Sequence, residues 1–154
     1  MSALSILYVL HGFPPETWAG TEIYTLELAR EMQRRGHRCT ILARTAGERE
    51  PGRDAPDFAV VEDRFEDLRV LRMVNRLDYA DLRETYDEPR AVRAFREVLL
   101  RERPDLVHFQ HLLHLSAGLV RQARDFNLPT VLHCHDYWAL CPRVQLIRPD
   151  GCLL

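Results

Sequence analysis

The chain has 154 residues, of which 46% are hydrophobic and 29% charged, and its formal net charge is −2. This length and composition are typical of one soluble globular domain, and the slight negative charge argues against a nucleic acid as a partner. No apolar run is long enough to span a bilayer and no secretory signal opens the sequence, so we expect a cytoplasmic protein.

The first 36 residues predict a strand, a long loop and a helix. Residues 4–10 form an apolar run typical of a buried strand, and residues 21–35 show helical spacing that ends at Gly36. The expected inward stripe of this helix consists of Ile23, Leu26, Leu28, Ala29 and Met32. A helix N-terminus just past a parallel strand favours phosphate or another anion, because its first N–H groups are free and lie at the positive end of the helix dipole. The loop glycines, Gly12 and Gly20, do not form the dinucleotide fingerprint, so no hydride-transfer cofactor is expected.

The rest of the chain alternates between strand and helix patterns. The predicted elements are strands over 38–43, 105–109 and 129–134, one or two strands within 58–74, and helices over 89–103 and 115–126. Leu68, Val70 and Met73 are the expected buried residues of the 58–74 segment, and Ser116 is a candidate helix N-cap. Such alternation indicates an α/β fold, with a parallel sheet covered by helices on both faces.

Ligands of parallel sheets collect at the carboxyl ends of the strands. The loops at this edge begin at His11, at Gln110-His111 and at His135-Asp136. A histidine beside a carboxylate can be held in one tautomer and can donate or accept a proton near neutral pH; a hydrogen-bonded structural His135 is the alternative. At the start of the first helix, Gly20 allows a ligand to approach the backbone closely, and an ordinary turn and cap is the alternative there.

Several short motifs, in this order and spacing, carry a resemblance to a known family. They are Pro14-Pro15, Ala19-Gly20-Thr21-Glu22, Leu28-Ala29, Gly36-His37, Arg103-Pro104-Asp105-Leu106-Val107-His108 and the stretch from His135 to Arg143. The set resembles the N-terminal domain of GT-B glycosyltransferases of the family 4 type. The resemblance implies a Rossmann-like parallel sheet flanked by helices, the N-terminal half of a GT-B architecture.

The resemblance also implies an activity, namely transfer of a sugar from a nucleotide-sugar donor to a saccharide or lipid-linked acceptor, with retention of configuration and without a metal or other cofactor. It places His135 near the reacting carbon of the donor sugar and the first loop near the donor diphosphate. The expected site residues are His135 for catalysis; Ala19, Gly20, Thr21 and Glu22 for the diphosphate or substrate; and Gly12, His111, Asp136 and Tyr137 for the acceptor cleft. The family often has glycine where this chain has Ala19, and alanine allows fewer backbone conformations.

A GT-B enzyme has a second domain of similar size, which binds the nucleotide. Residues 1–154 match only the acceptor-side domain, so we expect a chain truncated at its C-terminal end and inactive without that partner domain. The predicted helix over 89–103 carries five arginines against two glutamates. Peripheral contact with anionic lipid at the inner face of the membrane is therefore an alternative to a solvated helix surface.

Two other functions stay open from the sequence. Cys134, Cys141, Cys152 and His133 offer soft ligands, so the C-terminal cluster can be interpreted as a zinc-binding or interaction module. The chain can also be interpreted as a simple nucleotide-binding domain, which would bind a nucleotide without any partner domain.

Overall fold

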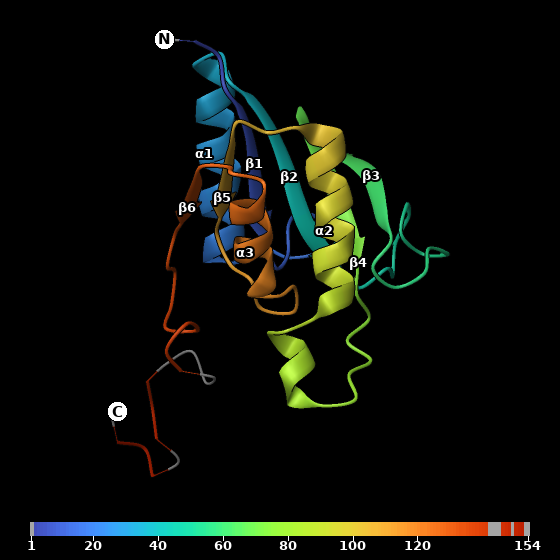
Figure 1. Ribbon diagram of the computed structural model, residues 1–154, viewed down its shortest axis with the longest axis vertical. Helices are drawn as coiled ribbons and strands as arrows, with labels where there is room; N and C mark the ends of the chain where they lie inside the picture. The colour runs from blue at the N-terminus through green and yellow to red at the C-terminus, as the bar shows by residue number, and fades with distance from the viewer. Residues whose placement is uncertain (1, 142–145, 149, 153–154) are drawn as a thin grey trace.

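The computed structural model describes residues 2–141, 146–148 and 150–152 (Figure 1). Pro142 and Arg143, the last residues of the motif that begins at His135, lie outside the described residues. The strands are β1 (Ser5–Leu10), β2 (Arg38–Thr45), β3 (Val60–Phe65), β4 (Leu68–Val74), β5 (Leu106–Phe109) and β6 (Thr130–Leu132). The helices are α1 (Gly20–Arg34), the 3-10 helix η1 (Leu82–Thr85), α2 (Pro89–Glu102) and α3 (Gly118–Asp125).

The strands form one six-stranded sheet in the order β3-β4-β2-β1-β5-β6. All neighbouring pairs are parallel except β3 and β4, which form an antiparallel hairpin at one edge. The predicted Rossmann-like α/β fold is therefore confirmed, and residues 58–74 contain two strands. The parallel order also brings the carboxyl ends of β1, β5 and β6 side by side at one edge.

The core is divided between the two faces of the sheet. Ile6, Tyr8 and Leu10 of β1 pack in the cluster that contains Leu26 and Ala29 of α1. Their neighbours Leu7 and Val9 belong to the opposite cluster, which α2 and α3 complete with Phe95, Val98, Leu99, Leu119 and Ala123. Figure 1 shows α2 and α3 together on one side of the sheet. Because both faces are covered, the central strands read as continuous apolar runs rather than as alternating patterns.

The buried face of α1 differs from the predicted stripe. Ile23 is 48% exposed, whereas Glu22 and Thr25 are buried beside Leu26. The reason is a local hydrogen bond, in which the Glu22 carboxylate turns inward and accepts from the backbone N–H of Ala19. Position 23 lies about 100° further round the helix, so it faces solvent.

The second half of the fold also differs in detail from the sequence prediction. Helix α3 begins at Gly118 rather than near Leu115, because a tight turn precedes it. The Ser116 hydroxyl accepts from the N–H groups of both Gly118 and Glu88, so it links the starts of α3 and α2. Strand β6 is short and exposed at the edge of the sheet. Within the described ranges, no helix combines the length and apolar character needed to cross a membrane.

Candidate functional site

The carboxyl ends of β1, β5 and β6 bring several histidines together beside the start of α1. His11 follows β1 and His111 follows β5, and their ring centroids lie 4.4 Å apart. His133 and His135 follow β6 and stack with centroids 4.3 Å apart at an interplanar angle of 8°. Tyr24 of α1 packs edge-on against His135, with centroids 5.2 Å apart. His133 and His135, two positions apart, therefore lie on the same side of this segment.

His111 is held in one tautomer by two hydrogen bonds. The backbone N–H of Leu113 donates to its Nδ1 at 3.1 Å, so the ring proton is on Nε2. Nε2 lies 2.9 Å from Oδ2 of Asp136 and donates to it. Both ring nitrogens are occupied and the side chain is 6% exposed. This arrangement suits His111 to position Asp136 rather than to act as a free base.

Asp136 accepts a second hydrogen bond, from the backbone N–H of Trp138, at 2.8 Å. Burial raises the pKa of its carboxyl, but the hydrogen bonds from Trp138 and His111 outweigh this effect, so the pKa lies below its ordinary value. Asp136 is therefore an anion near neutral pH and can accept a hydrogen bond from a substrate hydroxyl.

His135 is fixed by Gln110, whose Oε1 lies 2.8 Å from Nε2 of the ring. In the neutral imidazole that faces this oxygen, Nε2 carries the proton and Nδ1 is left as an acceptor. Burial, with His133 and His111 nearby, lowers the pKa of His135, so the ring is uncharged near neutral pH. His135 can thus orient a hydroxyl group without carrying a positive charge of its own.

The start of α1 is partly occupied by a carboxylate of the chain itself. Glu22 is 1% exposed; one oxygen accepts from Ala19 N–H at 3.2 Å and the other lies 3.6 Å from Nε2 of His11. Burial, with His111 nearby, lowers the pKa of His11 to about 4, so His11 is neutral at pH 7. The first intrahelical hydrogen bond runs from Ile23 to Ala19, and the preceding N–H groups at Gly20 and after it are the ones a ligand can reach.

The two glycines of the first loop have different roles. A Cβ on Gly12 would lie 2.4 Å from Oγ1 of Thr17 and 3.2 Å from Oε1 of Glu22, so a side chain there would force these neighbours to shift. A Cβ on Gly20 would meet nothing within 4 Å. Gly12 is therefore packed against Thr17 and Glu22, and the space beside Gly20 is open to a ligand.

An arginine of β4 holds the first loop in place, and the sequence analysis missed it. The Arg72 side chain is 2% exposed and donates to the carbonyl oxygens of Phe13 and Pro14, while its Nε donates to Asp63 at 3.0 Å. Its only sequence signal is a charge within the apolar run of β4. Since a buried guanidinium needs partners, this charge predicts a tertiary contact but does not identify the partner residues.

A cavity of about 630 Å³ adjoins the histidines. Its walls come from η1, from the residues after β5 and from residues 132–141, and we call it the apolar cavity. His111, His135 and Asp136 line it together, whereas Gly12 and the 51% exposed Tyr137 are outside its lining. From the sequence, Gln110 was expected only as the start of the loop that carries His111, not as a partner of His135, and Tyr24 was not expected at the site.

The cysteines do not form a site in the described part of the chain. Cys134, Cys141 and Cys152 are free thiols, of which Cys141 is buried and the other two are exposed. Among the residues that the structure describes, no group of three or more His, Cys, Asp or Glu side chains is placed to hold a metal ion. The zinc-binding alternative therefore gains no support from the geometry.

Comparison with known proteins places this arrangement in a family. No curated protein matches the chain. The family described as Glycosyltransferase Family 4 matches residues 18–150, which include α1, the whole sheet after β1 and the histidines that follow β5 and β6. The chain belongs to Glycosyltransferase Family 4.

Proposed function

We propose that the chain is the acceptor-side domain of a retaining, metal-independent glycosyltransferase that uses a nucleotide-sugar donor. The observation that supports this best is the position of His135 beside Tyr24 of α1, at the same edge of the sheet as the open N-terminus of that helix. On this proposal, the group that orients the sugar and the helix end that favours phosphate lie on one side of the domain.

The proposed roles follow from the charges and hydrogen bonds of these groups. Cleavage of a nucleotide-sugar leaves negative charge on the diphosphate, which the first N–H groups of α1, at Gly20 and after it, would stabilise. Neutral His135, fixed by Gln110, would accept a hydrogen bond from a donor-sugar hydroxyl at Nδ1. Asp136, held as an anion by His111, would accept a hydrogen bond from the acceptor hydroxyl.

The proposal includes a second α/β domain that binds the nucleotide, in keeping with the GT-B architecture that the sequence resembles. On this proposal residues 1–154 alone give no turnover and bind nucleotide-sugars weakly. We also propose that the enzyme acts in the cytoplasm with a solvated α2. Arg90, Arg96 and Arg101 each lie within 3.2 Å of a glutamate oxygen, which lowers the basic charge available to lipid.

The test uses the protein encoded by the complete reading frame, incubated with a panel of nucleotide-sugars and acceptors, with and without EDTA. We expect donor consumption that EDTA does not change and a product whose anomeric configuration, read by NMR, matches the donor. The variant His135→Ala is expected to lower kcat at least a hundredfold, because an interaction made at the reacting sugar is lost. His37→Ala is the matched control, since His37 lies at the opposite ends of the strands, before β2, and its activity should stay within twofold.

Each part of the proposal would be contradicted by a different result. Loss of activity in EDTA overturns metal independence, and an inverted product overturns retention. Appreciable transfer by residues 1–154 overturns the need for a second domain. Tight binding of free nucleotide without any transfer favours the simple nucleotide-binding domain instead.

A further inference from the structure

The apolar cavity has a size suited to a small organic ligand. Its volume of about 630 Å³ lies within the range of pockets that bind cofactors and drug-sized molecules. Most of its wall is apolar, and the main apolar side chains are Leu82, Leu112, Leu113, Val120, Leu132 and Leu140. A free sugar has hydroxyl groups on all sides and would leave many of them without partners against such a wall.

The polar groups of the cavity are gathered at one end. They are the fixed histidines His111 and His135 with their partners Asp136 and Gln110. Gln110 is 1% exposed, and its amide Nε2 is buried without a hydrogen-bond partner in the described structure. An unpaired buried donor is costly, and this amide adds to the polar character of this end of the cavity.

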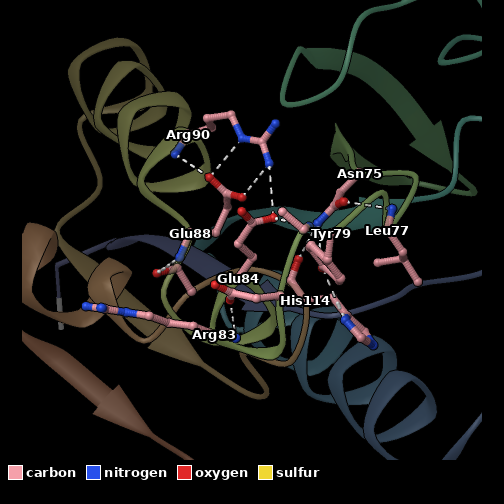
Figure 2. A network of polar contacts seen from close by, with 11 residues as sticks. Asn75, Leu77, Tyr79, Arg83, Glu84, Glu88, Arg90 and His114 are labelled. Carbon is pink, nitrogen blue, oxygen red and sulfur yellow. Dashed lines mark hydrogen bonds and ion pairs between the residues drawn. The ribbon is translucent and has the colours of Figure 1, made fainter.

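The outer wall of the cavity is fixed by hydrogen bonds before any ligand arrives. The backbone N–H of His114 donates to the carbonyl oxygen of Thr85 in η1 at 3.1 Å, and that of Ala117 donates to Tyr86 at 2.7 Å. Figure 2 shows Asn75 and Tyr79 beside His114; Asn75 Nδ2 donates to the His114 carbonyl at 2.8 Å. A wall already in place lowers the ordering cost of binding, which favours a defined ligand.

We propose that the apolar cavity binds an amphipathic acceptor, in which a hydroxyl-bearing head group lies at the His111–His135 end and an alkyl or aryl group fills the apolar end. The chemistry shared by such ligands is an apolar group of a few to several carbons joined to a polar head. The assignment of the ligand as acceptor rests on the proposed function. The amphipathic character rests on the apolar wall of the cavity and on the polar groups gathered at its other end.

The test is a binding measurement on the 154-residue chain in a Trp18→Phe background. Trp138, which lines the cavity, is then the only tryptophan and reports binding by its fluorescence. The probes are methyl, octyl and phenyl β-D-glucopyranoside, with the octyl compound kept below its micelle concentration. We expect the octyl or the phenyl compound to bind at least ten times more tightly than the methyl compound, since burial of about two methylene groups accounts for a tenfold difference.

The two apolar probes separate the two kinds of acceptor. Tighter binding of the octyl compound identifies an alkyl-bearing acceptor, and tighter binding of the phenyl compound identifies an aryl-bearing one. Equal binding of all three probes, or no binding of either apolar probe, overturns the proposal.

Variants show whether binding takes place in the cavity. Leu140 lines the cavity but is 79% exposed, so Leu140→Ser does not disturb the core; we expect it to weaken binding of the preferred probe at least threefold. Leu100→Ser is the matched control, because Leu100 is an exposed leucine of α2 outside the cavity and its loss should have no effect. Equal binding by both variants would indicate adsorption elsewhere and overturns the proposal.

The result of this binding test does not depend on the proposed function. Absence of sugar transfer with apolar binding intact contradicts the proposed function alone. Transfer at equal kcat/KM to methyl and octyl glucosides by the full reading-frame protein contradicts the amphipathic acceptor alone.

Discussion

The two walls of the candidate site are built in different ways. The first wall, residues 11–22, is fixed from behind by buried groups, namely Arg72 on its carbonyl oxygens, Gly12 in close contact with Thr17, and the inward Glu22. The second wall, residues 133–141, is mostly exposed and is joined to the loop after β5 by the side-chain hydrogen bonds His111–Asp136 and His135–Gln110.

This difference indicates that the two walls have different roles in ligand binding. A buried polar contact is costly to lose, because its partner is left unpaired away from water, whereas an exposed partner can turn to solvent. The first wall is therefore preorganised, as an electrostatic site for a charged group requires. The second wall can adjust to ligands of different shape at a smaller cost in free energy.

The largest effect is expected from Arg72→Met in the first wall. The change leaves the carbonyl oxygens of Phe13 and Pro14 without their donor and the carboxylate of Asp63 without its partner. We expect the free energy of unfolding to fall by about 3 kcal/mol, measured by urea denaturation. Arg64→Met, at an exposed arginine of β3, is the control and should change stability by less than about 0.5 kcal/mol. Equal stability of the two variants would show that Arg72 does not hold the loop.

The next effect is expected from Gly12→Ala, which places a methyl group 2.4 Å from Oγ1 of Thr17. Overpacking of this kind costs about 2 kcal/mol. The double variant Gly12→Ala/Thr17→Ala removes the closest contact, so thermal unfolding should show that it recovers at least half of the loss. Recovery is expected to be incomplete because Oε1 of Glu22 stays 3.2 Å from the new atom. A double variant no more stable than the single one would place the strain elsewhere.

Much of the fold could be predicted because local patterns determine it. Pro89 starts α2 as expected, since proline at the first helical position costs no hydrogen bond. Leu68, Val70 and Met73 are fully buried as predicted. The meeting of His111 and Asp136 also followed from topology, because loops after neighbouring parallel strands lie at the same edge.

The rest depends on contacts between distant parts of the chain and on side-chain rotamers. Arg72 and Phe13 are 59 positions apart, and no periodicity connects them. Glu22 is an acidic residue, so the sequence predicts an exposed side chain, whereas the side chain is buried. Only its contacts with the N–H of Ala19 and with His11 explain this orientation. The apolar cavity depends on the packing of η1, which lies in a weakly patterned acidic segment, so its existence could not be predicted from that segment.

The smallest effect is expected in the second wall, from Asp136→Asn. The Asp136 side chain is 35% exposed, and solvent screens its contacts with His111 and Trp138, so the loss at pH 7 should be at most about 1 kcal/mol. The pKa of Asp136 is lower in the folded chain than its usual value near 3.9, so the carboxylate stabilises the fold above that pH and this contribution is lost as the pH falls through the folded value. The stability difference between wild type and Asp136→Asn, measured by urea unfolding, should therefore shrink between pH 7 and pH 3. A stability difference that does not change with pH would show that the charge of Asp136 does not contribute to stability. A loss of stability as large as that from Arg72→Met would show that the second wall is as firmly fixed as the first.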